Sequence, residues 1–157
     1  MVEVVDIADD SAVRVSCKLE LEGVPNAQAG PRIGKCGFCK PNSKAKTGFK
    51  AIVKSGASDT PTFEEGQLVA VKIKFHMRRP DAHFKCNDRL KALKAIPPFA
   101  HVASPDIDNL AKFVLDGMNK LVHHDDRQVA KLVLCKLFDS EHGCNGQTVI
   151  EVTKFDW

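Results

Sequence analysis

The sequence predicts an α+β fold: a single domain with a mixed or antiparallel sheet and two main helices. Three observations lead to it. The chain has 157 residues, of which 43% are hydrophobic, and this length fits one domain with a proper core. Several stretches alternate apolar and polar residues, as half-buried strands do. One long stretch spaces its apolar residues by three and four, which predicts an amphipathic helix.

The first half of the chain begins with four acids and no base in residues 1–10, which we expect to be a flexible acidic tail within one domain spanning residues 1–157. Residues 13–21 alternate and predict a strand. Residues 23–42 are rich in Gly and Pro and predict a loop. Residues 45–55 predict a short basic helix. Residues 67–77 alternate again and predict a second strand.

The second half begins with a connection over residues 79–102, longer than is usual in compact domains, which indicates a functional role. Residues 104–122 carry the helical apolar spacing. Residues 128–138 are apolar on both sides and predict a strand covered on both faces. Asn145-Gly146 indicates a turn, and residues 148–153 predict the last strand.

The sequence gives no sign of a membrane span or of export. No apolar run approaches the roughly 18 residues that a spanning helix needs, and residues 1–6 lack the features of a secretory signal. We therefore expect an intracellular protein with reduced cysteines. Cys36 and Cys39 form a C-x-x-C pair, which is half of a zinc site. A second half would have to come from His142 and Cys144 or from His83 and Cys86, and these spacings are poor, so we expect reduced loop thiols there rather than a structural zinc.

The net charge of +3 is too small to indicate a polyanionic partner, but the charges are distributed in blocks. Residues 23–58 hold seven Lys and Arg and no acid, and residues 74–94 hold seven against two acids. A basic face of this kind attracts phosphates. A solvated face rich in lysine would give the same pattern, and the charges alone do not separate the two interpretations.

Two pairs of carboxylates flank the predicted long helix. Asp106 and Asp108 stand at its start, and Asp125 and Asp126 follow its end. Carboxylate oxygens are the ligands that Mg²⁺ prefers, and Lys112, one turn beyond Asp108, could neutralise charge on a phosphate. Capping of the helix is the ordinary alternative for acids at its start. A helix of about 14 residues is roughly 21 Å long, so the two pairs meet only if the chain returns.

The residues around these acids match a known pattern. The run from Ser104 to Asn119, which contains Pro-Asp-Ile-Asp-Asn-Leu-Ala-Lys, and the run from Val122 to Val129, which contains Asp-Asp-Arg-Gln-Val, closely resemble the RusA-like Holliday junction resolvases. Every polar position expected in the two runs is present. The resemblance implies a small α+β homodimer that cuts four-way DNA junctions symmetrically, in recombination or repair, with Mg²⁺ or alternatively Mn²⁺.

The same resemblance assigns roles to individual residues. It implies that the catalytic and metal-binding carboxylates are Asp106, Asp108 and Asp126, with Asp125 as a neighbouring carboxylate. It also implies that Lys112 is a catalytic or phosphate-contacting lysine and that Asn109 and Gln128 support the site. In such a dimer, one chain alone need not build the whole site. The expected location is a compartment that contains DNA, such as the cytoplasm or nucleoid. Within the basic blocks, the residues expected to bind DNA are Arg32, Lys35, Lys44, Lys46, Arg78, Arg79 and Lys85.

Two other functions remain as alternatives. A catalytically silent module of the same fold could bind junctions or other nucleic acids, although carboxylates facing phosphate would not help a pure binder. An enzyme using D-x-D on nucleotides or sugar phosphates would leave the basic blocks and the second acid pair unexplained. His123 and His124 precede that pair; we expect exposed turn residues, with a ligand role as the alternative.

Overall fold

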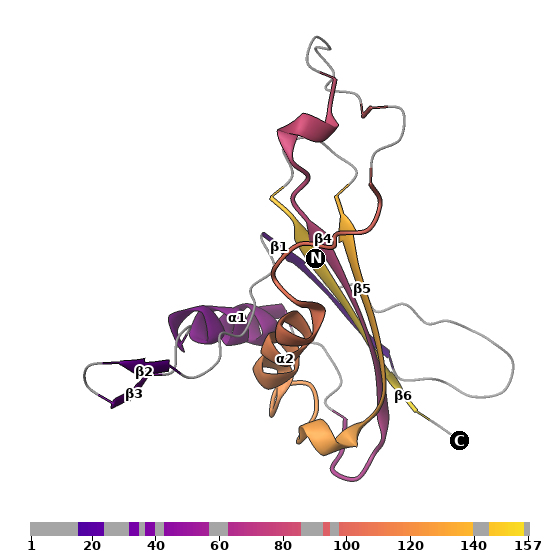
Figure 1. Cartoon of the computed structure of the whole chain (residues 1–157). Coiled ribbons are helices and arrows are strands. Elements are labelled where there is room, and N and C mark those ends of the chain that lie inside the picture. Colours follow the sequence, from indigo (N-terminus) through magenta and orange to yellow (C-terminus); the bar gives the residue numbers. More distant parts are fainter. Residues whose placement is uncertain are drawn as a thin grey trace, which may run out of the picture.

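The described elements form a four-stranded mixed sheet with two helices packed on one of its faces (Figure 1). The computed structural model describes residues 16–23, 32–34, 37–39, 43–56, 63–85, 93–94, 98–139 and 145–155. It confirms the predicted α+β class and the two main helices. The acidic stretch at residues 1–10 lies outside the described residues.

The elements follow one another along the chain, with η marking a 3-10 helix. Their bounds are β1 (Ser16–Glu22), β2 (Arg32–Gly34), β3 (Gly37–Cys39), α1 (Ser43–Gly56), β4 (Val69–Met77), η1 (Asp81–His83), α2 (Ile107–Met118), η2 (Asp126–Gln128), β5 (Val129–Phe138) and β6 (Gln147–Lys154). The strand order across the main sheet is β1-β6-β4-β5, and β2 pairs with β3 in a separate two-stranded sheet. The β2–β3 pair lies where the sequence predicted only a loop.

Strand β4 is antiparallel to β6 and parallel to β5. A parallel pair cannot be joined by a short hairpin, so the chain must return from the end of β4 to the beginning of β5. Helix α2 makes this return and runs against the direction of the two strands (Figure 1). The start of α2 therefore lies toward the end of β4, and its last turn lies toward the beginning of β5.

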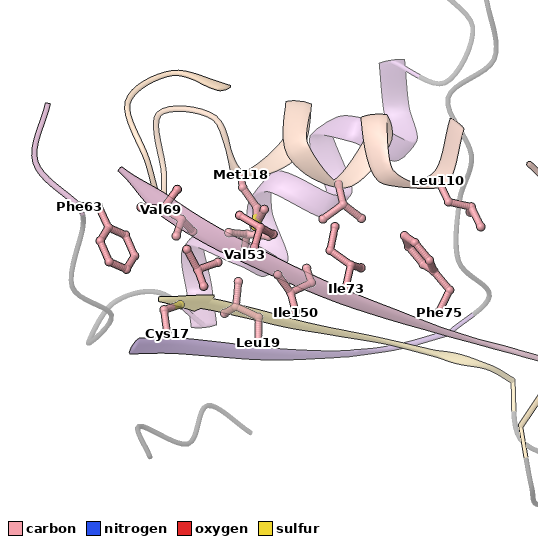
Figure 2. Close-up of a cluster of buried hydrophobic side chains, with 14 of the residues drawn as sticks. Cys17, Leu19, Val53, Phe63, Val69, Ile73, Phe75, Leu110, Met118 and Ile150 are labelled. Carbon is pink, nitrogen blue, oxygen red and sulfur yellow. The ribbon is translucent and has the colours of Figure 1, made fainter. Parts of the chain in front are cut away.

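The core lies between the sheet and the two helices. Alternate residues of β4 are buried on the helix side, while Lys72 on the opposite face is exposed, as the alternation of a strand requires. Helix α2 contributes apolar residues spaced by four, and α1 contributes Val53. Figure 2 shows the resulting cluster, which includes Cys17, Leu19, Val53, Phe63, Val69, Ile73, Phe75, Leu110, Met118 and Ile150.

Helix α2 is shorter than the apolar spacing predicted, because the chain leaves helical geometry at Asn119 (ψ 128°) and Lys120 has a positive φ of 65°. The amides of Leu121 and Val122 both donate to the carbonyl oxygen of Met118. Val122 is nevertheless buried. The turn folds back onto the core, so the apolar spacing continues where the helix does not.

The prediction that both faces of β5 are covered was wrong. Leu132 is 41% exposed and Val133 is 43% exposed. Strand β5 lies at the edge of the main sheet, and these two side chains point to opposite faces. The described helices pack on one face only, and they leave the middle of this edge strand open. In addition, none of the described helices is long and apolar enough to cross a membrane.

Gly117 allows α1 and α2 to approach closely, because a Cβ at this position would overlap two ring atoms of Phe49. The Phe49 ring packs edge-on against Phe113, with ring centroids 5.3 Å apart. We predict that Gly117→Ala destabilises the fold by about 1–3 kcal/mol through overpacking, although alanine favours a helix more than glycine does. The free energy of unfolding in urea measures this change.

Gly48→Ala on α1 is the matched control, since a Cβ there meets nothing within 4 Å. It should be neutral or stabilise the protein by up to about 1 kcal/mol. Equal effects of the two substitutions would contradict the packing argument.

Candidate functional site

The start of α2 carries the first acid pair. Asp106 occupies the N-cap position with an extended backbone (φ −69°, ψ 146°), and its side chain makes no capping hydrogen bond. Asp108 lies in the first turn, and both side chains are exposed. Lys112, one turn further, is also exposed, and Asn109 is half-buried. Capping therefore does not occupy the Asp106 carboxylate, which stays accessible to a ligand.

The segment that enters α2 is held by Lys136 on β5. Its ammonium Nζ donates to the carbonyl oxygens of Ala103 and Pro105, each at 2.7 Å. The His101 amide donates to the Lys136 carbonyl oxygen at 3.2 Å. These contacts fix the backbone directly before Asp106 to the far part of β5.

The second acid pair lies in the turn before β5, where Asp125 caps η2. The Asp125 Oδ1 atom accepts hydrogen bonds from the backbone amide of Arg127 at 2.9 Å and from its Nε at 3.0 Å. These hydrogen bonds lower the pKa of the Asp125 carboxyl to about 2. This carboxylate thus already has a partner in the structure.

Gln128 fixes that turn to the segment before β4. Its buried side chain accepts at Oε1 from the amides of His124 (2.7 Å) and Asp125 (3.1 Å). Its Nε2 donates to the carbonyl oxygens of Glu64 (2.6 Å) and Gln67 (2.9 Å). All the hydrogen-bonding capacity of this amide is used to hold backbone, so Gln128 positions the acidic turn.

Asp126 lies in a partly enclosed environment just beyond the end of α2. Asn119 Nδ2 donates to its Oδ1 over 3.4 Å, and His123 Nε2 lies 3.9 Å from the same oxygen. Burial raises the pKa of the Asp126 carboxyl, and the negative charge of Asp116 raises it further. Its side chain is still 42% exposed, so the carboxylate reaches solvent.

His123 was expected to be an exposed turn residue, and the structure shows that it is fully buried. Burial lowers its pKa, so the ring is neutral at pH 7. Its neighbour His124 is exposed, as expected. His123 is buried because of the tight turn after α2, in which residues 119 and 123 pair as an isolated bridge. Sequence periodicity gives no signal for a turn that folds inward.

Lys46 of α1 and Asp116 of α2 form an ion pair at 2.7 Å and join the two helices. Both side chains are about 30% exposed. The sequence assigned Lys46 to DNA binding, but its ammonium is paired with Asp116. Neither the pairing nor the influence of Asp116 on Asp126 could be read from the spacing of the residues.

One chain does not bring the two acid pairs together. Helix α2 has 12 residues and is about 18 Å long. Asp126 precedes Val129, the first residue of β5, whereas the start of α2 is anchored at Lys136, seven residues along that strand, or about 23 Å. The chain does not fold back after α2 in a way that would place Asp126 beside Asp108. Within the described ranges, no three His, Cys, Asp or Glu side chains could hold a metal ion.

A family model described as endodeoxyribonuclease RusA matches residues 22–153. The chain belongs to the RusA endodeoxyribonuclease family. At the level of the family, RusA proteins act on branched DNA and resolve Holliday junctions, and membership implies that the chain is a nuclease. Both acidic segments lie inside the matched range. No curated protein matches the chain significantly.

Apart from Lys46, which is paired with Asp116, the basic residues expected to bind DNA in this RusA family member fall into three groups. Lys44 on α1 and Arg78 and Lys85 after β4 are exposed. Arg78 and Lys85 follow the end of β4, at the same end of the sheet as the start of α2. Lys35 and the side chain of Arg32 lie outside the described residues. So do Cys36 and the side chain of Cys39, and the expectation of no zinc there stays a prediction.

Arg79 forms the third group, because it is buried rather than presented to solvent. Its Nε donates to the Asp139 carbonyl oxygen at 2.6 Å and its Nη1 to the Pro98 carbonyl oxygen at 2.8 Å. The guanidinium also lies over the Phe138 ring, 5.1 Å from the centroid. These contacts give Arg79 a structural role in holding the segment that leads to α2, and we leave it out of the proposed phosphate contacts.

We predict that Asp126→Asn raises the melting temperature by about 1–2 °C at pH 7, a small change because the carboxylate is half-exposed. Since the folded-state pKa of Asp126 is raised, the folded protein binds this proton more readily than the unfolded chain, and ionisation at neutral pH costs stability. The difference should vanish below the unfolded value of 3.8, where the acid is protonated in both states. Thermal unfolding at pH 7 and pH 3 tests this.

Asp125→Asn is the matched control with the opposite sign. Its folded-state pKa is lowered to about 2, so its contribution is present above 3.8 and is lost as the pH falls toward 2. The substitution should lower the melting temperature at pH 7. Shifts of the same sign for the two variants would refute the assignment of their environments.

Proposed function

We propose that this RusA family member is a divalent-metal-dependent endonuclease that resolves four-way DNA junctions by paired cleavage, with Mg²⁺ or alternatively Mn²⁺. The observation that carries the proposal is the pair of exposed carboxylates at the start of α2, where Asp106 makes no capping hydrogen bond. Carboxylates that neither cap a helix nor lie buried suit a hard divalent cation.

We propose that the complete site is shared by two copies of the chain. Asp106 and Asp108 of one copy would meet Asp126 of the other, with Asp125 adjacent, because one chain keeps these groups about 18 Å apart along α2. A symmetric dimer then contains two equivalent sites, which suits the two-fold geometry of a junction cut on two strands. Gln128, which fixes the acidic turn, and half-buried Asn109 would support the site.

The remaining roles follow from exposure and charge. These carboxylates would hold a divalent ion, which would supply Lewis-acid chemistry at the phosphodiester. Lys112, exposed one turn beyond Asp108, would neutralise charge that develops on the phosphate. Exposed Lys44, Arg78 and Lys85 would contact backbone phosphates without reading sequence, so binding would weaken as salt rises.

We predict that Asp108→Asn reduces cleavage of a four-way junction at least about 100-fold, because a bound metal contributes several kcal/mol to such catalysis. Junction binding should persist, since the substitution removes a negative charge. The measurement compares a labelled junction with a matched linear duplex, in Mg²⁺ and in EDTA. Glu65→Gln, which removes one exposed carboxylate elsewhere, is the control and should cleave as the wild type does.

Junction binding without cleavage by the folded wild type would favour the silent binding module instead. Failure to bind DNA at low salt would favour the remaining alternative, an enzyme that acts on nucleotides or sugar phosphates. Either result would overturn the proposed nuclease activity.

The shared site makes a separate prediction. We expect Asp108→Asn and Asp126→Asn homodimers to be inactive, whereas a heterodimer of the two variants regains one intact site of two. Co-expression with two different tags isolates this heterodimer, which should nick junctions at about half the wild-type rate per dimer and make few paired cuts. Sites built within single chains would leave the heterodimer inactive, because each chain would then carry one lesion.

A further inference from the structure

The buried imidazole of His123 lacks the hydrogen bonds that a buried polar side chain normally makes with its neighbours. Its side chain is completely buried, and neither ring nitrogen makes a hydrogen bond of standard geometry, although the Asp125 backbone lies close enough to the ring to raise its pKa slightly against the effect of burial. The buried polar side chains of Arg79 and Gln128, by contrast, have their groups satisfied by backbone carbonyls and amides. An unsatisfied buried polar group costs about 1–3 kcal/mol. An apolar side chain would be more stable at this position, unless the nitrogen has a partner that is not part of this chain.

The groups around His123 indicate what that partner is. Its Nε2 faces Asp126 Oδ1 across 3.9 Å, which is too long for a hydrogen bond. Asn119 contacts the same carboxylate through Nδ2, and its own Oδ1 is buried without a partner. One short turn therefore gathers an imidazole nitrogen, an amide oxygen and a carboxylate, and the first two lack partners.

The separation of the two facing atoms suits an ion between them. A zinc-class ion binds nitrogen and oxygen at about 2.0–2.2 Å, which places two tetrahedral ligands roughly 3.4 Å apart. His123 Nε2 and Asp126 Oδ1, at 3.9 Å, need to approach by only about half an ångström to meet this geometry. The carboxylate is accessible to solvent, whereas His123 Nε2 is buried, so an ion would meet Asp126 first and reach the imidazole through a small opening of the turn.

We propose that His123 Nε2 and the Asp126 carboxylate bind one divalent transition-metal ion, with Asn119 Oδ1 as the adjacent oxygen. This inference rests on the proposed function in one respect, since it takes Asp126 as a ligand of the metal used by the nuclease. An imidazole nitrogen suits ions such as Co²⁺ and Zn²⁺, whereas sets made only of oxygen suit Mg²⁺. His123 thus gives this chain a preference for transition metals over Mg²⁺.

The test measures binding of Co²⁺ and of Mg²⁺ to the full-length protein by calorimetry. The wild type should bind Co²⁺ at least about tenfold more tightly than Mg²⁺. In His123→Leu the affinity for Co²⁺ should fall at least about tenfold, with a much smaller change for Mg²⁺, so that the preference disappears. His124→Leu, which alters the exposed neighbour, should keep the wild-type preference. An unchanged ratio in His123→Leu, or no preference in the wild type, would overturn the proposal.

A second measurement does not require a variant to fold. Pulsed electron paramagnetic resonance of Mn²⁺ bound to the wild type should show coupling to an imidazole ¹⁴N nucleus, and its absence would refute nitrogen ligation. If junctions are cleaved normally while His123→Leu keeps the wild-type metal preference, only the role of His123 fails. If Asp108→Asn cleaves normally while His123 governs metal preference, only the nuclease proposal fails.

Discussion

The parallel pairing of β4 with β5 is the constraint on which the site geometry depends. Two parallel neighbours need a crossover connection, and here the crossover contains α2. The helix must run back along the strands, from the end of β4 to the beginning of β5. Acids at its start and acids after its end are consequently held at opposite ends of the sheet, whatever their side chains would favour.

Each end of this crossover is fixed by one polar side chain, the first end to β5 by Lys136 and the second to the segment before β4 by Gln128. Lys136 holds the carbonyl oxygens that precede Asp106, and Gln128 holds the amides that precede Asp126. Both use several hydrogen bonds to backbone, which gives a more definite geometry than a single contact would. The helix, the strand and these two anchors set the distance between the two acid pairs, and this spacing is the reason for proposing that a second copy completes the site.

The acidic turn shows how adjacent residues of one type come to differ. Asp125 is engaged by Arg127, and this hydrogen bonding lowers its pKa. Asp126 has no comparable donor, and burial raises its pKa. Perturbed carboxyls of this kind concentrate at functional sites, where stability is given up for chemistry. The buried ring of His123 belongs to the same turn, and under the proposed metal binding the cost of burying it is recovered when the ion binds.

Local patterns in the sequence sufficed for much of the fold. The alternation of apolar and polar residues correctly predicted β4, and the helical spacing of apolar residues predicted most of α2. The predicted bounds of the basic helix α1 were correct to within about two residues. The same reasoning failed where a residue's environment depends on distant segments. Val122 continues the helical spacing although the helix has ended, and Leu132 is apolar although it lies at an open edge. The spacing of apolar residues indicates which residues face the core, but it does not show whether those residues belong to a helix, a strand or a turn.

By itself the sequence determined the α+β class and the family and predicted the acids of the proposed metal site, because these depend on residue type and on near spacing. The tertiary structure decided how those acids are distributed. It showed that Asp106 does not cap its helix, that Lys46 and Arg79 are engaged within the protein, and that His123 is buried beside Asp126. The physical reason is that strand pairing and helix packing join residues far apart in the chain, and no local pattern encodes which of them will meet.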